Sequence, residues 1–175
     1  MKKFASVLAL VLFVFPGTTL AKPAQQSEEI KVLNQWIGVW ENRIVIKPSA
    51  WVVDKEEFTG TKNVEWFLDG HFQQATSKTP HETTYEIFRY DHESKLYQRW
   101  SYNSEGITSF WTGAWDKEIN TLTWKMEFSP HINGYIKDRF VGVNAYKTEM
   151  TLTDHKGTLL LDILIESTRV ERGDN

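Results

Sequence analysis

Charged side chains at several points of the chain could supply acid–base pairs for catalysis. The candidates are Glu65, Glu127, Asp138, Arg139 and Glu149. General acid–base catalysis needs such groups within hydrogen-bond reach of a substrate. No nucleophile elbow, phosphate loop or zinc signature accompanies them, and charge pairs across neighbouring strands explain most such residues. The sequence therefore leaves catalysis undecided, favours a protein that is not an enzyme, and assigns no catalytic residue.

Histidine is the other residue type that could do chemistry here. The five histidines are His71, His81, His92, His131 and His155. None has the spacing of a metal motif such as His-Glu-x-x-His. Three fall in expected turns and two follow a proline, positions typical of the solvated surface. We therefore predict no metal site, with a ligand set assembled across loops as the open alternative.

Eight tryptophans are the unusual feature of the composition. They either fill the interior of a β-structure or line an aromatic pocket, since ligand sites are mostly apolar with a few placed polar groups. Polar residues with the same strand parity as apolar ones favour a pocket, because a solid core rarely tolerates unpaired polar groups. The predicted ligand-binding residues are Trp40, Asn42, Arg89, Gln98, Trp100, Ser109, Trp111, Trp124 and Thr148. Some of these faces could point outward instead, and Gln98 and Trp100 are ambiguous.

These residues need elements to position them, and the patterning predicts strands. Ser27 is a plausible helix N-cap before Glu28 and Glu29, and a short helix follows up to about residue 37. From Trp40 the hydrophobic period changes to two. The expected strands cover residues 40–47, 58–67, 72–77, 83–90, 96–102, 107–115, 121–128, 135–143, 146–153 and 158–170.

Short polar turns join most of these strands, and Asp69-Gly70 predicts a two-residue hairpin turn. One longer connection, residues 129–134, is the only hint of a Greek key. Because no βα alternation occurs, a parallel sheet is not expected. An antiparallel meander of this length hides its edges by closing on itself. The fold class is therefore all-β: an antiparallel meander barrel of about ten strands with a short N-terminal helix.

The first residues are typical of a secretory signal peptide. Lys2-Lys3 precedes an apolar run from Phe4 to Phe15 that is shorter than the roughly 18 residues of a membrane anchor. We predict cleavage near Ala21 and export, periplasmic or secreted, with no stable membrane insertion afterwards. The predicted organisation is a signal peptide at 1–21, a leader at 22–27, the barrel domain at 28–170 and a frayed tail at 171–175.

Cleavage would remove two lysines and no acid, so the net charge would change from −3 to −5. A mildly acidic domain without a basic stripe is a poor nucleic-acid binder. No cysteine is present, which excludes disulfides and a lipid-modified N-terminal cysteine. The oligomeric state stays open.

A set of short motifs occurs in order along the chain: Leu33-x-x-Trp36-x-Gly38-x-Trp40, the hairpin Leu68 to Phe72, Tyr90-Asp91, Tyr97-x-x-Trp100, Gly113-x-Trp115-Asp116, Thr121-Leu122-Thr123, Glu149-Met150 and Thr168-Arg169. Together they resemble the exported lipocalin-like (calycin) family catalogued as domain of unknown function 1579. His71 departs from the basic residue expected in the hairpin. The resemblance implies that the first and last strands are neighbours and that Arg169 packs over Trp40, with Gly38 as a further structural residue. It implies no established activity.

A neighbouring kind of small barrel carries haem through a histidine about seven residues before the terminal arginine. Asp162 stands near that position here, so we predict no haem and no other cofactor. Three hypotheses follow: binding of a small, largely apolar ligand in the barrel, a ligand-free envelope or interaction module, and an enzyme using the same cavity. The enzyme would hold two titratable groups with shifted pKa values inside the barrel.

Overall fold

Ten antiparallel strands pair in sequence order, and the first strand closes on the last to form a barrel. The computed structural model describes residues 27–170. The predicted signal peptide, most of the leader and the predicted frayed tail lie outside these residues. The strands are β1 (Gly38–Lys47), β2 (Glu56–Phe67), β3 (Phe72–Lys78), β4 (Thr83–Asp91), β5 (Leu96–Asn103), β6 (Thr108–Asp116), β7 (Thr121–Glu127), β8 (Ile132–Gly142), β9 (Ala145–Asp154) and β10 (Leu159–Arg169).

The predicted fold class is confirmed: the protein is an all-β antiparallel barrel with one short helix before the first strand. Two details of the prediction were wrong. Strand β8 begins at Ile132, so the long connection expected there is a short turn. The expected two-residue turn at Asp69-Gly70 is a four-residue turn, because the β2–β3 pairing ends at Phe67 and Phe72. Leu68 and Asp69 have positive φ in this turn, as Gly70 does. Within residues 27–170, no helix is long and apolar enough to cross a membrane.

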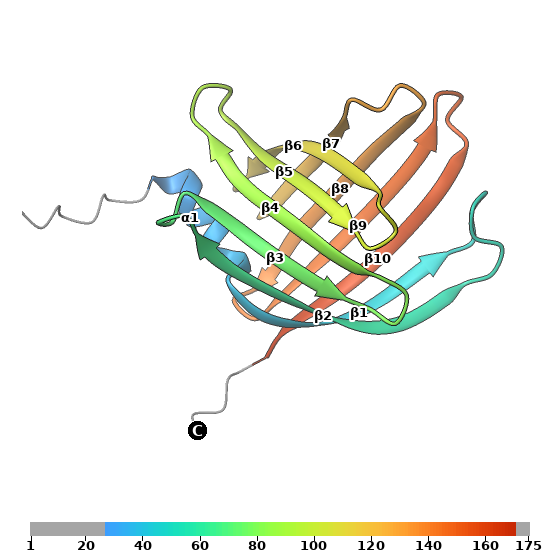
Figure 1. Cartoon of the computed structure of the whole chain (residues 1–175), viewed down its shortest axis with the longest axis horizontal. Coiled ribbons are helices and arrows are strands. Elements are labelled where there is room, and N and C mark those ends of the chain that lie inside the picture. The colour runs from blue at the N-terminus through green and yellow to red at the C-terminus, as the bar shows by residue number, and fades with distance from the viewer. Residues whose placement is uncertain (1–26, 171–175) are drawn as a thin grey trace, which may run out of the picture.

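The helix α1 (Glu28–Leu33) and the following 3₁₀ turn η1 (Asn34–Trp36) lie at one end of the barrel. In Figure 1, α1 is at the left, and the turns joining β1 to β2 and β9 to β10 are at the right. The side chain of Ser27 accepts a hydrogen bond from the Ile30 amide and caps α1. A helix of six residues is unstable alone, so the barrel must hold it in place.

Barrel side chains fix α1 and η1 by hydrogen bonds to their backbone carbonyls. Gln73 Nε2 donates to the carbonyl of Leu33 over 2.7 Å, and Tyr97 OH donates to that of Glu29 over 3.0 Å. Trp40 Nε1 donates to the carbonyl of Trp36 over 2.7 Å. The carbonyls of Leu33 and Trp36 lie at the ends of α1 and η1, where a helix leaves carbonyls without intrahelical partners, so two of these bonds satisfy them. The α1 end of the barrel is therefore closed.

The core is concentrated at this closed end and is largely aromatic. Its buried rings are Trp36, Trp40, Phe88, Tyr97, Trp111, Trp124, Phe140 and Tyr146. Two glycines make room for the largest of them. A Cβ at Gly113 would lie 2.6 Å from Cε3 of Trp124, and one at Gly134 would lie 2.8 Å from Cη2 of Trp111. The rings of Trp124 and Trp111 therefore lie directly against the backbone at Gly113 and Gly134.

The seam between β1 and β10 has the contact that the lipocalin-like resemblance implies. Trp40 and Arg169 are cross-strand partners, and the guanidinium carbon lies 4.1 Å from the centroid of the indole ring. Arg169 also donates to the carbonyls of Gln35, over 2.8 Å, and of Ile37. One side chain thus joins the last strand to the first strand and to the segment before it.

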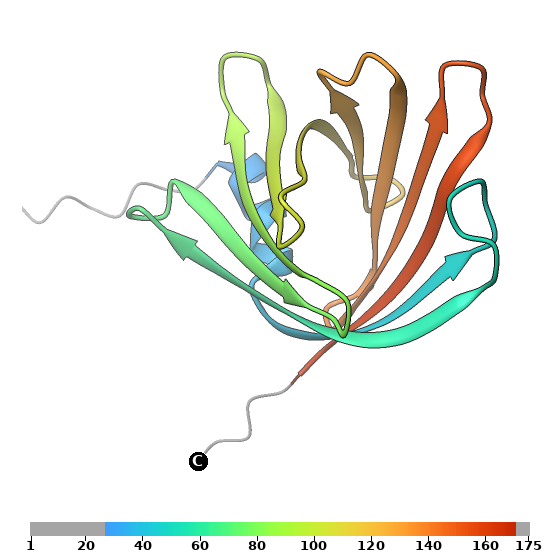
Figure 2. The same ribbon diagram turned by 45° about the vertical axis from the view of Figure 1, so that its right-hand side comes forward.

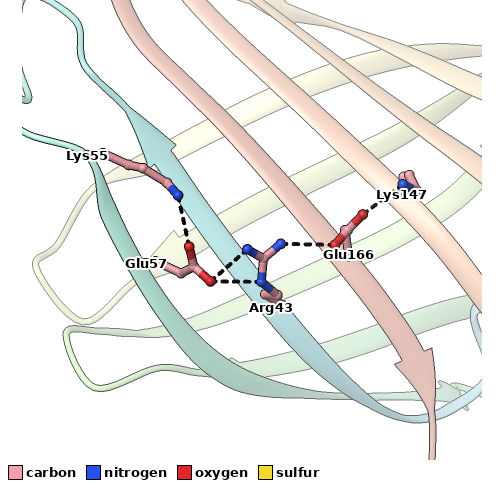
Figure 3. A network of polar contacts seen from close by, with 5 residues as sticks. All are labelled: Arg43, Lys55, Glu57, Lys147 and Glu166. Carbon is pink, nitrogen blue, oxygen red and sulfur yellow. Dashed lines mark hydrogen bonds and ion pairs between the residues drawn. The ribbon is translucent and has the colours of Figure 1, made fainter.

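Outside the barrel, an ion ladder crosses the same seam (Figure 3). Arg43 on β1 bonds Glu57 on β2 at 2.7 Å and Glu166 on β10 at 3.1 Å. Lys55 bonds Glu57, and Lys147 on β9 bonds Glu166 at 2.7 Å. The hydrogen bond from Lys55 and the contacts with Arg43 lower the pKa of Glu57. The ladder connects four neighbouring strands on the solvent face.

Candidate functional site

Strand alternation places a belt of polar side chains inside the barrel, directly above the aromatic core. We call this set the polar belt: Asn42, Lys62, Glu86, Arg99, Asp138, Thr148 and Ser167. Its members come from β1, β2, β4, β5, β8, β9 and β10, and each shares the parity of inward-facing core residues on its own strand. Buried polar groups of this number must bond to one another, to water or to a ligand.

The centre of the belt is an ion triad formed by Lys62, Glu86 and Arg99. Lys62 Nζ lies 2.8 Å from one carboxylate oxygen of Glu86, and Arg99 Nη2 bonds the other. The side chain of Glu86 is 3% exposed, whereas those of Lys62 and Arg99 are 12% and 14% exposed. The two cations therefore still reach open space inside the barrel.

The triad keeps its members charged. Burial by itself would raise the pKa of Glu86, but the charges of Arg99 and Lys62 outweigh it and lower this pKa to about 2. Burial would lower the pKa of Lys62, but the charge of Glu86 raises it instead. A general acid or base works best with a pKa near the working pH. The shifted groups therefore suit electrostatic binding better than proton transfer.

The rest of the belt forms two smaller hydrogen-bonded groups. Asp138 accepts hydrogen bonds from Trp124 Nε1, over 2.8 Å, and from the Thr148 hydroxyl. The Ser167 hydroxyl donates to Asn42 Oδ1 over 2.8 Å. Each strand from β8 through β10 to β1 thus contributes a polar group at this level.

Below the belt, aromatic rings form the floor of the interior. Lys62 Nζ lies 5.3 Å from the centroid of Phe88, and the Arg99 guanidinium carbon lies 5.5 Å from the same centroid. Arg99 is also 5.9 Å from the Trp124 ring. Cations are attracted to ring faces, so the rings hold both cations at one side of the floor.

Above the belt, the inward-facing side chains are mostly apolar and only half-buried. They are Ile46, Phe58, Met126, Met150, Leu161, Ile163 and Ile165. Half-buried Thr84, Ser101 and Ser109 add hydroxyls on β4, β5 and β6. Because the barrel is closed laterally, an inward-facing side chain is exposed to space inside it or at its end. We call the end opposite α1, turned forward in Figure 2, the mouth, and its inner wall is largely apolar and half-buried.

Six of the predicted ligand-binding residues face the interior. Trp40, Trp111 and Trp124 are at most 2% exposed and belong to the aromatic floor, not to an accessible wall. Asn42 and Thr148 lie in the polar belt. Ser109 lies near the mouth and accepts a hydrogen bond from Trp111 Nε1 over 2.8 Å.

The other three predicted residues, Arg89, Gln98 and Trp100, lie on the outer face, which corrects the parity expected for β4 and β5. Arg89 Nε donates to Gln98 Oε1 over 2.6 Å, and its guanidinium lies 5.8 Å from the Trp100 ring. Both faces of these strands carry aromatic and polar residues, so alternation alone could not show which face is inside.

That wrong choice of face explains why the sequence analysis missed Glu86 and Arg99. Both have the parity of Phe88 and Tyr97, and this aromatic pair was the available signal. Lys62 was missed although it lies on the same, apolar face of β2 as Val64. A lysine on a core face was the strongest unused indication of a site.

The candidates for acid–base catalysis are not brought together. Glu65 bonds Gln74 on the outer face and Glu127 bonds Thr112 there, whereas Asp138 faces inward. Arg139 and Glu149 are exposed. Asp162 pairs with Lys47 outside the barrel. Across residues 27–170, no three His, Asp or Glu side chains gather as a metal site would require.

No known protein family and no curated protein matches the sequence, so the resemblance to domain of unknown function 1579 has no support from these comparisons. Solved structures do match. The S-type phycobiliprotein lyase CPES from Guillardia theta is 11% identical, with a TM-score of 0.55 over 86% of this chain and 97% of the other. Rv2717c from M. tuberculosis is 12% identical, with a TM-score of 0.65 over 83% of this chain and 99% of the other.

A protein of unknown function from the DUF3598 family of Nostoc punctiforme is 9% identical, with a TM-score of 0.55. That match covers 79% of this chain but 48% of the other, so this chain corresponds to only part of that protein. At such identities the likeness concerns the fold alone. What the chain shares with these proteins is a lipocalin-like β-barrel.

Proposed function

We propose that this protein binds a small, largely apolar molecule inside the barrel and admits it through the end opposite α1. The observation that carries the proposal is the contrast along the barrel axis. The α1 end is filled by aromatic rings, whereas inward-facing Ile46, Met150 and Ile163 at the other end are half-buried. An apolar wall exposed to water inside a barrel is stabilised when a ligand covers it.

Binding of a neutral solvatochromic dye, Nile red, tests the proposal. Ile163→Trp would fill the interior and weaken Nile red binding by about tenfold or more. Leu164→Trp, on the outward face of the same strand, is the matched control and should leave the affinity unchanged. A wild-type protein that leaves Nile red fluorescence unmoved, with no small molecule retained in native mass spectrometry, would contradict the proposal.

An interaction module is the second candidate, and one outer surface favours it. Phe128 is 89% exposed, and its ring stacks on Phe110 at 5.6 Å, with Trp100 beside Phe110. Exposed aromatic patches often mark contact surfaces. Phe128→Ser should then abolish any self-association seen in sedimentation velocity while leaving Nile red binding intact.

Export is part of the proposed function and rests on residues 1–21 of the sequence. The charged start, the short apolar run and the small residues before Lys22 support it. Expression of the full chain in a Gram-negative bacterium should yield a periplasmic or secreted protein beginning at Lys22. Full-length protein confined to the cytoplasm would contradict export without affecting the binding proposal.

A further inference from the structure

The polar belt offers more hydrogen-bond donors than acceptors around its ion triad. Both carboxylate oxygens of Glu86 are already bonded, one by Lys62 and one by Arg99. The ammonium of Lys62 has three N–H groups, and its bond within residues 27–170 is the one to Glu86. Arg99 Nε is buried and has no hydrogen-bond partner in this part of the chain.

A buried donor without a partner is costly, so native structures nearly always satisfy it with protein, water or ligand. Here the donors belong to two cations that lie over the same ring, Phe88, and whose side chains are only partly buried. Lys62 and Arg99 share the one carboxylate of Glu86, so the triad has a formal charge of +1. Asp138 also attracts Arg99, but its hydrogen bonds come from the neutral groups of Trp124 and Thr148.

We propose that the polar belt binds the carboxylate of an otherwise apolar ligand, with Lys62 and the guanidinium of Arg99 as its donors. A singly charged anion offsets the charge of the triad, and its oxygens supply the missing acceptors. This inference rests on the proposed function. It adds the chemical class and the orientation of the ligand: the carboxylate lies deep at the belt, and the apolar body lies against Met150, Ile163 and Ile165.

The choice between a carboxylate and a neutral head group can be measured with two probes of equal length. Isothermal titration with dodecanoate and with dodecan-1-ol keeps the apolar body constant and changes the head group. The wild-type protein should bind dodecanoate at least about tenfold more tightly than the alcohol, as expected for one charge-assisted hydrogen bond.

Two variants of the triad should shift this preference in opposite directions. Lys62→Met removes a donor and should weaken dodecanoate binding about tenfold while changing alcohol binding little. Glu86→Gln removes the internal carboxylate that competes with the ligand, so dodecanoate should bind more tightly. If the triad served folding alone, both variants would bind both probes more weakly. Circular dichroism before each titration checks that each variant is folded.

Each outcome decides one of the two proposals. Equal binding of acid and alcohol, insensitive to both variants, would overturn the carboxylate site and leave ligand binding in the barrel intact. Loss of dodecanoate affinity in Glu86→Gln would also overturn it. Failure of Nile red and of both probes in the wild-type protein would overturn the proposed function, and the carboxylate site with it.

Discussion

At the scale of single residues, Arg169 carries the most connections in the described structure. Its guanidinium covers Trp40, which is fully buried, and donates to carbonyls of residues 35 and 37. A planar guanidinium can stack on a ring and donate at its edge at once, which an ammonium cannot do as well. Gly38 lies beneath it, where a Cβ would come within 2.7 Å of Arg169 Nη1.

Replacing Arg169 with alanine should lower the free energy of unfolding by about 2 kcal/mol, because the cation–π contact and the hydrogen bonds are lost together. Arg169→Lys should lower it less. Urea denaturation followed by circular dichroism measures the change. Arg139→Ala, at an exposed position on the outer face of β8, should leave the midpoint unchanged. If Arg169→Ala also left the denaturation midpoint unchanged, the seam contact would have no stabilising role.

At the scale of elements, the ion triad ties β2, β4 and β5 together inside the barrel. Glu86 and Arg99 are not direct cross-strand partners: Glu86 lies across from Ser101, and Arg99 lies across from Phe88. Breaking such a group leaves a buried charge without a counter-charge, which is costly. The triad therefore constrains how these strands sit relative to one another.

The stability that Glu86 contributes should depend on pH. Its pKa falls from 4.5 in the unfolded chain to about 2 in the folded protein. A lowered pKa stabilises the folded state above the unfolded value, and this stabilisation is lost as the pH falls from about 4.5 to about 2. The contribution lost is about 3 kcal/mol.

The comparison with Glu86→Gln isolates this effect from other carboxylates whose pKa is also lowered in the folded protein, such as Glu57 and Glu166. At about pH 7 the variant should be less stable than the wild type, because two buried cations lose their counter-charge. Toward about pH 2 the two unfolding free energies should converge. A constant difference across this range would show that Glu86 is not charged in the folded protein.

At the scale of the whole molecule, closure of the barrel depends on the seam between strands near the two ends of the described chain. Trp40 and Arg169 join them inside, and Arg43 joins Glu57 and Glu166 outside (Figure 3). Closure leaves no free sheet edge for another chain to pair with. It also makes the half-buried inward side chains of all strands the inner wall of one barrel.

Arg43→Gln should lower the melting temperature at low salt, and the difference should shrink as salt is added, because exposed ion pairs are screened. Thermal melts followed by tryptophan fluorescence at two salt concentrations give the measurement. Arg139→Gln again serves as the control. A decrease that did not change with salt would indicate that Arg43 acts through packing and not through the ladder.

The sequence by itself determined the architecture. Alternation with a period of two, short polar turns and the absence of helical segments after residue 37 specify an antiparallel meander, and a meander of ten strands has to close. The inward face was equally clear on β1, where Trp40, Asn42, Ile44 and Ile46 contrast with charged neighbours. Gly38-x-Trp40 and Arg169 further indicated which strands meet.

The tertiary structure decided which face is inside where both faces are mixed, and it assembled the site. On β4 and β5 the sequence offered Arg89, Gln98 and Trp100 as readily as Glu86 and Arg99, and only packing against the Phe88–Trp124 floor selected the second set. Lys62, Glu86 and Arg99 are distant in the chain and meet because register and barrel closure aim them at one point. Alternation is a local property of a strand, whereas the meeting of side chains from different strands depends on the whole barrel.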